Sequence, residues 1–266
     1  MRVALGIEYD GSRYCGWERQ RHCLAVQEVL EQAVAAVAAA PIATVCAGRT
    51  DAGVHAAWQV VHFDTGAERP DHAWVLGTNA NLPGDVSVRW SHRVDRRFHA
   101  RFSAEWRRYR YYVLSRPTRP ALLRGRVTWE RRPLDVERMR AAATALVGEH
   151  DFSAYRAVAC QARTPVRTVH ELAIREWRGL LVIDVRANAF LHHMVRNIAG
   201  VILEIGTGRR DPGWAAEVLA TRDRAAGGVT APPDGLYLVD VGYPPGLGLP
   251  APRGEETEVF PRDALW

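Results

Sequence analysis

The spacing of apolar residues predicts six elements in the first hundred positions. Residues 2–9 are mostly apolar without helical spacing, as in a strand, whereas apolar side chains from Val26 to Val37 recur every three or four positions, as on a helix. The predicted elements are strand 2–9, helix 24–39, strands 44–46 and 58–65, helix 71–80 and strand 85–94. This β-α-β-β-α-β order is that of the ferredoxin-like split unit.

The same order of patterns recurs after residue 100. Its predicted elements are strand 102–114, helix 135–147 with Asp135 as its cap, hairpin strands 169–177 and 180–187, helices 191–205 and 212–220, and strand 236–241. We therefore predict an α+β fold with two similar ferredoxin-like halves. They form a mixed, largely antiparallel sheet with helices on one face and a central cleft.

Three parts follow from these patterns: an N-terminal half (1–100), a C-terminal half (101–243) and an irregular tail (244–266). Residues 116–133 are rich in arginine and proline and are predicted to form an exposed connection. A chain of 266 residues can bury roughly 70% of its unfolded surface, so it does not depend on disulfides or metals for stability.

Composition excludes several classes of enzyme. All 35 basic residues are arginine, and the formal net charge is +5. Without lysine the chain cannot form a Schiff base, bind pyridoxal phosphate as an aldimine or supply the lysine of a Walker A loop. Guanidinium groups suit contacts with phosphate and stacking on bases.

The four cysteines are widely spread, and none forms a Cys-x-x-Cys pair. We interpret them as reduced, partly buried thiols rather than a disulfide framework or a metal site. The chain shows neither a signal-type leader nor an apolar run of about 18 residues, so we expect a cytoplasmic protein with no membrane partner.

The first candidate site is the loop 45–56, in which Asp51 lies between Arg49 and His55. Gly48 and Gly53 permit tight backbone conformations, and Arg49 can favour the ionised carboxylate by its charge. Such a carboxylate suits a nucleophile or a group that stabilises positive charge. An Asp-Ala-Gly sequence is by itself more often an ordinary turn.

The second candidate is the segment 89–110, which contains eight arginines against Asp95 and Glu105, a local charge of 8 − 2 = +6. Aromatic residues interleave with these arginines: Trp90, Phe98, Phe102, Trp106 and Tyr109. This composition is typical of a groove that follows a nucleic-acid backbone and offers stacking surfaces. The alternative is a pair of solvated arginine-rich strands.

Strand alternation within this segment puts Arg107, Tyr109 and Tyr111 on one face and Arg108, Arg110 and Tyr112 on the other.

The third candidate is Arg196, which interrupts the apolar helix 191–205. If its face is buried, its guanidinium requires a carboxylate, for which we propose Asp51. The adjacent His192 and His193 have no third ligand nearby in sequence, so we predict no metal site.

Four ordered motifs resemble the tRNA pseudouridine synthase A family: Glu8-Tyr9-Asp10-Gly11 with Gly16-Trp17, Gly48-Arg49-Thr50-Asp51-Ala52-Gly53-Val54-His55, Phe98-His99-Ala100-Arg101-Phe102 with Arg107-Arg108-Tyr109-Arg110-Tyr111, and Asn188 to Ile198 with Pro233-Asp234-Gly235-Leu236. The resemblance extends over residues 2–243. It implies that Asp51 is catalytic, that Tyr109 and Arg196 belong to the active site and that Leu236 lines it. We predict that Arg49, His55 and Arg107, with Tyr109 and Leu236, contact the substrate.

The resemblance also implies a homodimer that needs no cofactor and isomerises uridine to pseudouridine at positions 38, 39 and 40 of the anticodon stem-loop of tRNA. Asp51 is then expected to start cleavage of the glycosidic bond, and Tyr109 to stack on uracil and remove its C5 proton. The alternative hypothesis is a non-catalytic RNA-binding or RNA-chaperone protein with the same fold.

Overall fold

A computed structural model describes residues 1–252 and 259–260 of the chain. Five α-helices and ten β-strands lie within these residues, and the strand pairs are mixed but largely antiparallel, which confirms the predicted α+β class. The chain divides into two compact units. Unit 1 contains Met1–Trp106 and the described residues from Tyr237 onward, and unit 2 contains Arg107–Leu236.

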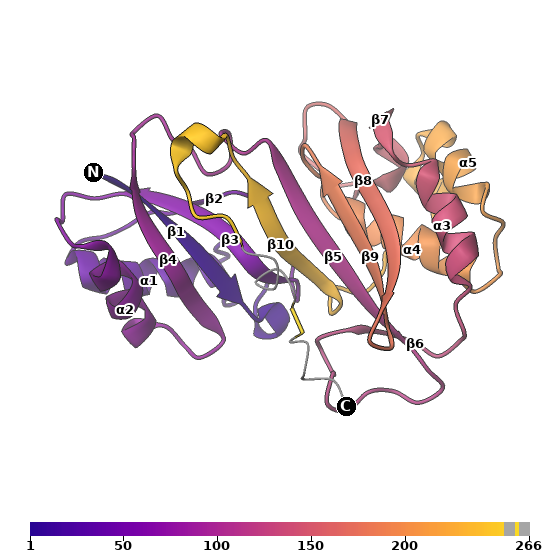
Figure 1. Cartoon of the computed structure of the whole chain (residues 1–266), viewed down its shortest axis with the longest axis horizontal. Coiled ribbons are helices and arrows are strands. Elements are labelled where there is room, and N and C mark those ends of the chain that lie inside the picture. The colour runs from indigo at the N-terminus through magenta and orange to yellow at the C-terminus, as the bar shows by residue number, and fades with distance from the viewer. Residues whose placement is uncertain (253–258, 261–266) are drawn as a thin grey trace. The chain divides into compact units, whose positions relative to one another are not determined.

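Unit 1 has the predicted β-α-β-β-α-β order. Its elements are β1 (Arg2–Tyr9), α1 (Val26–Ala38), β2 (Val45–Cys46), β3 (His55–Asp64), α2 (Asp71–Asn81) and β4 (Val86–Val94). The strands pair antiparallel in the order β4-β1-β3-β2, and β10 (Leu236–Gly242) pairs with β3 in parallel through Tyr237 and Leu238. Within unit 1 the helices α1 and α2 cover one face of this sheet (Figure 1).

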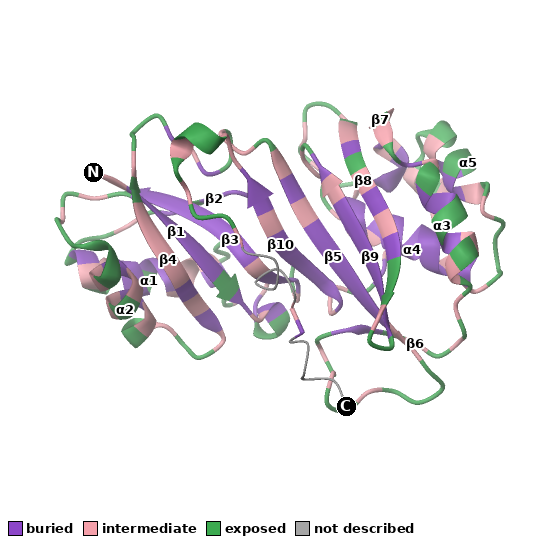
Figure 2. Cartoon of the chain, in the orientation of Figure 1, coloured by how far each residue is buried: buried purple, intermediate pink, exposed green. Residues whose placement is uncertain are grey.

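The core of unit 1 follows from the apolar pattern of the sequence. Val3, Leu5 and Ile7 of β1 and Leu30 and Val34 of α1 are at most 1% exposed. The strands β1 and β3 are buried along most of their length, whereas the outer surfaces of the helices carry the exposed side chains (Figure 2). Helix α1 ends at Ala38, and the next residue, Ala39, has a positive φ that turns the chain out of the helix before Pro41.

Unit 2 contains β5 (Trp106–Ser115, from Arg107 on), β6 (Thr128–Glu130), α3 (Val136–Thr144), β7 (Gly148–Asp151), β8 (Val166–Trp177), β9 (Leu180–Ala187), α4 (Met194–Gly206) and α5 (Trp214–Thr221). Its sheet has the order β5-β9-β8-β7, with β6 paired in parallel with β5. Two local predictions are confirmed. The Asp135 side chain accepts a hydrogen bond from the Arg138 amide at 3.0 Å, and Arg178 and Gly179 both have positive φ in the β8–β9 hairpin.

Some predicted boundaries and features are wrong. The strand predicted from residue 102 begins at Trp106, and the helix predicted from residue 191 begins at Met194 after a left-handed residue, His193. Strands β6 and β7 were not predicted, because Thr-Trp-Glu and Gly-Glu-His-Asp have no apolar alternation; both form by pairing with a neighbour. The tail predicted at 244–266 lies partly outside the described residues.

Cysteine chemistry also differs from the prediction, because Cys15 and Cys23 form a disulfide. The Cys15 amide donates to the Leu24 carbonyl at 2.9 Å, so the loop folds back and brings the two residues together. Cys46 and Cys160 are free thiols, as predicted for all four. No helix within the described part of the chain has the length and apolar character needed to cross a membrane.

Asp184 of β9 is a fully buried carboxylate at the centre of unit 2. It accepts hydrogen bonds from Arg108 at 2.6 Å and from Arg110 at 3.0 Å, both on β5, and from Arg175 on β8. These contacts confirm the predicted alternation, since Arg108 and Arg110 share the face opposite Tyr109. The carboxylate therefore fixes the register of three neighbouring strands.

We expect Asp184→Asn to lower the free energy of unfolding by about 3 kcal/mol, because the arginines lose the charge that compensates their desolvation. Urea unfolding at pH 7 measures this change. The matched control is Asp211→Asn, whose side chain is 93% exposed and pairs with Arg138 at 3.0 Å; it should change stability by less than about 0.5 kcal/mol. Equal effects of the two substitutions would contradict a structural role for Asp184.

Candidate active site

The loop that carries Asp51 is fixed at its start by a buried glutamine. Gln59 of β3 is fully buried, and its side chain accepts from the Gly48 amide at 3.3 Å and donates to the Gly48 carbonyl at 2.6 Å. The Ala47 amide donates to the Val60 carbonyl at 2.8 Å. These bonds pair both backbone groups of Gly48 and the Ala47 amide just before Arg49, and sequence reasoning did not identify Gln59.

A second segment of unit 1, residues 14–17, holds the end of the same loop. The Trp17 amide donates to the Thr50 carbonyl at 3.0 Å, and the Gly53 amide donates to the Tyr14 carbonyl at 3.2 Å. Gly16 has a φ of +96°, and a side chain there would come within 2.5 Å of the Thr50 carbonyl oxygen. Glycine is therefore required for this close approach.

The aromatic residues of this segment are buried. Trp17 and Tyr14 are at most 4% exposed, and the Tyr14 hydroxyl donates to Asp85 at 2.6 Å. Both side chains are therefore packed inside the protein. Tyr9 is buried as well, and its hydroxyl forms a 2.8 Å hydrogen bond with the Thr50 hydroxyl, next to Asp51.

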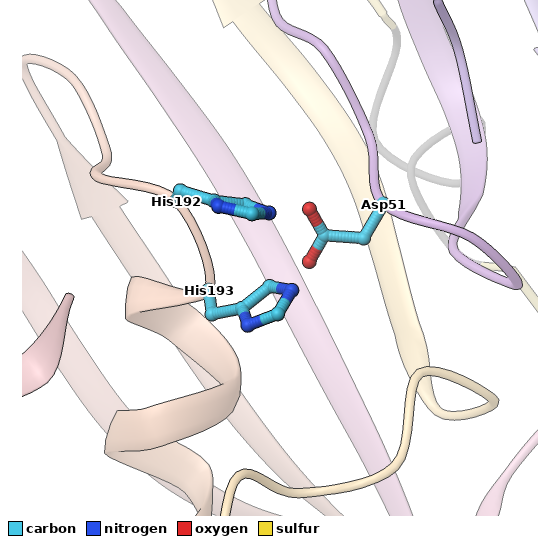
Figure 3. Close-up of side chains that lie close together, drawn as sticks. All are labelled: Asp51, His192 and His193. Carbon is cyan, nitrogen blue, oxygen red and sulfur yellow. The ribbon is translucent and has the colours of Figure 1, made fainter. Parts of the chain in front are cut away.

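Asp51 itself is half-buried at the first position of a tight turn. The Val54 amide donates to its carbonyl at 3.1 Å, and Gly53 has a φ of +77°. Its carboxylate projects from the loop (Figure 3). The Arg49 guanidinium, whose side chain is 59% exposed, pairs with Glu18 at 2.5 Å. Arg49 thus remains largely in solvent at the edge of the loop.

His55 begins β3 and is 1% exposed. Its Nδ1 accepts from the Gly11 amide at 3.0 Å and lies 3.1 Å from an Asp10 oxygen, and its ring stacks on Tyr237 with centroids 4.4 Å apart. The contact with His55 and the Ser12 amide lower the pKa of Asp10 strongly. The contacts of His55 in the structure therefore lie within unit 1, and its contact with substrate stays a prediction.

In unit 2 the predicted residues gather on one face of β5. Tyr109 is 7% exposed and meets the Phe190 ring edge-on at 5.1 Å, and the Arg107 guanidinium donates to the Asn188 carbonyl at 3.0 Å. Both contacts link β5 to the segment that precedes α4. The prediction that Arg107 and Tyr109 share a face agrees with this arrangement.

Arg196 lies in the first turn of α4, where its Nε donates to the Ala231 carbonyl at 2.9 Å. The Tyr111 hydroxyl donates to the Pro232 carbonyl at 2.9 Å, and the Tyr112 amide donates to the Gly235 carbonyl at 2.8 Å. The segment 231–236, including the buried Leu236, is thus fixed to both β5 and α4. Arg196 and Leu236 are therefore positioned by one network in unit 2, and Tyr109 lies on β5, the strand to which this network is bonded.

His192 and His193 form the turn into α4, with ring centroids 4.0 Å apart (Figure 3). His193 has a φ of +61°, which is uncommon outside glycine and delays the start of the helix.

Burial raises the pKa of the Tyr111 phenol, against the opposing positive charge of Arg196.

The eight arginines of residues 89–110 do not act as one charged surface. Arg107, Arg108 and Arg110 lie in unit 2 and bond to groups of that unit. The exposed ones are Arg93, Arg96, Arg97 and Arg101 of unit 1. The sequence count therefore overstates the charge available to a polyanion in this segment.

A turn at residues 99–103 ends this exposed stretch. The Ser103 amide donates to the His99 carbonyl at 2.8 Å, and the Arg101 and Phe102 amides both donate to His99 Nδ1 at 3.2 Å. His62 of β3 supports the turn, because its Nδ1 accepts from the Ala100 amide at 3.1 Å. Burial, with the charges of Arg2 and His99, lowers the pKa of His62 to about 4.

Comparison with known proteins identifies relatives over nearly the whole chain. A family profile described as tRNA pseudouridine synthase matches residues 6–103 and 142–244. The protein named tRNA pseudouridine synthase A of Pseudomonas aeruginosa is 61% identical over 250 residues, which are 94% of this chain and 88% of the relative. Proteins of the same name are 58% identical in Nitrosococcus oceani (94% and 96% covered) and 54% identical in Methylococcus capsulatus (99% and 97% covered).

The lowered pKa of His62 predicts a pH dependence of stability. Between its folded pKa of about 4 and an unfolded value of about 6.5, the unfolded chain binds an extra proton, so stability falls as pH falls through this window. The total contribution of His62 is about 3 kcal/mol. We expect His62→Asn, which keeps an acceptor for the Ala100 amide, to give a flatter profile in urea unfolding between pH 7 and 4.5.

The control is His72→Asn, because His72 is exposed on α2. Its profile should follow that of the unsubstituted protein. A parallel profile for His62→Asn instead would show that His62 titrates normally in the folded state.

Proposed function

The chain belongs to the tRNA pseudouridine synthase family; it is an isomerase that converts uridine to pseudouridine in tRNA, and we propose that its targets are the uridines at positions 38, 39 and 40 of the anticodon stem-loop. The relatedness of the chain along nearly its whole length carries this proposal. The four motifs that resemble the family are the same segments that hold the candidate residues in place.

The proposed reaction needs neither a redox partner nor a net gain or loss of atoms. The bond between N1 of uracil and C1′ of ribose breaks, the base turns, and C5 bonds to C1′. A proton leaves C5 and N1 gains one, so the product is an isomer. The protein must supply a carboxylate at the sugar, a base for the C5 proton and a surface that holds the detached uracil.

We assign the carboxylate to Asp51. It either attacks C1′ or removes a ribose proton to give a glycal, and both routes require an anionic oxygen held at a fixed place beside the sugar. The hydrogen bonds at Gly48, Thr50 and Gly53 restrict the loop, so little conformational entropy is lost when the substrate binds.

We propose that Tyr109 stacks on the uracil and removes the C5 proton, that Arg196 keeps Asp51 ionised, and that Arg107, Leu236 and His55 complete the binding site. The edge-on contact with Phe190 and the fixed segment 231–236 support this assignment, because they hold Tyr109, Arg196 and Leu236 in one part of unit 2. The aromatic ring and the leucine offer an apolar surface for a planar base.

Arg49 is proposed to help extrude the target nucleotide, since a stacked base hides the atoms that react. Its pairing with Glu18 supports this role. Both side chains are about half exposed, so the ion pair contributes less than about 1 kcal/mol and a phosphate can replace it. The guanidinium is therefore available without disturbing the loop.

We further propose a cytoplasmic homodimer that works on tRNA without a cofactor. A dimer can contact one tRNA at two places and so increase its effective affinity. Sedimentation equilibrium at micromolar concentration tests the assembly, and a monomer that retains full activity would exclude the need for it.

The alternative, an RNA-binding or RNA-chaperone protein without catalysis, is separated from the isomerase by Asp51→Asn. We expect this variant to lose release of tritium from tRNA labelled at C5 of uridine by more than about a thousandfold, because catalysis loses its charged group. Its affinity for tRNA should remain. Asp211→Asn should leave both quantities unchanged, and absence of tritium release from the unsubstituted protein would exclude the enzymatic function.

A second prediction concerns salt. Exposed arginines that contact phosphates release counterions, so tRNA affinity should fall with a log–log slope of about −3 or steeper between 50 and 300 mM salt. Filter binding at several salt concentrations measures the slope. A flat profile would argue against recognition of the tRNA backbone by arginine.

A further inference from the structure

Phe102 is an unusual aromatic residue in this protein because its side chain is 75% exposed. Within the described residues, Trp129 is the next most exposed of the Phe, Tyr and Trp side chains, at 41%. A phenylalanine in water loses the stabilisation that burial of its ring would provide, about 2 kcal/mol or more. Phe102 does not gain this stabilisation, because most of its side chain is exposed in the folded unit.

The backbone under Phe102 is rigid. Besides the bonds to His99 already described, the His99 amide donates to the Ser103 hydroxyl at 3.0 Å, and the Tyr243 hydroxyl donates to the Ala100 carbonyl at 2.7 Å. Phe98, at the start of the turn, is 1% exposed and packs against Tyr243. The turn is anchored in the core of unit 1, so its exposed ring occupies a defined position.

The ring is also backed by other groups. The His99 imidazole lies 4.3 Å from the Phe102 ring at an angle of 31°, and His99 in turn contacts His62 at 4.8 Å. The Arg101 guanidinium lies 5.5 Å from the centroid of the Phe102 ring, within the range of a cation–π interaction. The turn thus presents an aromatic ring and a cation together.

The surrounding charge is positive. From Asp95 to Phe102 the chain has Arg96, Arg97 and Arg101 against one acid, Asp95, which pairs with Arg97 at 3.1 Å. No other large apolar side chain in this segment is exposed. A single ring among guanidiniums is typical of a surface that stacks a base, whereas the core of a protein interface is a larger patch of mostly apolar area.

The turn also lies beside the strand that leads into the Asp51 loop. Val45 of β2 pairs with His62 of β3, and the His62 ring accepts the hydrogen bond from the Ala100 amide at 3.1 Å. The next residue of β2, Cys46, leads into the Asp51 loop. The turn and the Asp51 loop are therefore joined through His62 and β2.

We propose that Phe102 and Arg101 form a stacking platform for an unpaired base of the tRNA, distinct from the uridine that reacts. The platform rests on the function proposed above, because that function supplies the RNA. Phe102 stacks on the base, and Arg101 contacts the base or its phosphate. The platform adds affinity and fixes the position of the RNA, and it takes no part in the chemical step.

Phe102→Ala tests the platform. We expect tRNA affinity in filter binding to fall about tenfold, the KM for tRNA to rise by a similar factor, and kcat at saturating tRNA to stay within about twofold. Phe102→Trp and Phe102→Tyr should retain affinity, whereas Phe102→Leu should lose it, because leucine is apolar but has no π face. Arg101→Gln should reduce the salt slope by about one, and Phe102→Ala should leave it unchanged.

Leu122→Ala provides the matched control, since Leu122 is also 75% exposed but lies in unit 2. It should bind tRNA normally. Unchanged affinity of Phe102→Ala, or equal binding by the leucine and tryptophan variants, would overturn the platform. A change in sedimenting mass of Phe102→Ala would assign the ring to a protein interface instead. Failure of the proposed function shows separately, as an unsubstituted protein that makes no pseudouridine.

Discussion

The pairing of Gln59 with both backbone groups of Gly48 is the interaction on which the candidate site depends most. Gly48 is half-buried, and its amide and carbonyl would each cost up to about 3 kcal/mol if they were left unpaired inside the protein. The carboxamide is the side chain that can satisfy a donor and an acceptor at once, and β3 places it fully inside the protein. These two hydrogen bonds therefore restrict the conformation of the backbone that runs from Cys46 toward Asp51.

The other side of the loop is fixed by contact between two backbones rather than by side chains. Residues 14–17 are tied to α1 by the bonds Val26 N to Gly16 O at 3.2 Å and Gln27 N to Trp17 O at 3.0 Å, and the same residues bond to Thr50 and Gly53. The start of α1 and the Asp51 loop are therefore held together through one short segment. Glu31 of α1 adds to this link, since it accepts from the Thr44 amide at 2.7 Å.

Local patterns predicted the elements with a clear period, including both strands of the hairpin and the helices α1 and α2. They could not predict β6 or β7, whose stability comes from a neighbouring strand rather than from their own residues. Charge and turn chemistry made Asp51 a candidate, and the resemblance of its loop to the family motif singled it out. Gln59 and Glu31 could not, because a buried polar residue in a strand or helix has no distinctive sequence signal until its partner is known. The disulfide between Cys15 and Cys23 was not predicted either, because the loop that joins these two residues has no regular structure and its sequence does not indicate that they lie close together.

Arginine serves two purposes in this chain, and the sequence alone does not separate them. Asp184 draws Arg108 and Arg110 into the sheet of unit 2, where their charge is compensated and fixes strand register. On the same stretch of sequence, a tight turn keeps Arg101 at the surface beside an exposed ring. The difference arises from strand alternation next to a buried acid in one case and from an anchored turn in the other. A positive segment therefore supports RNA binding only after its buried carboxylates have been located, and here that removes Arg108 and Arg110 from the candidates.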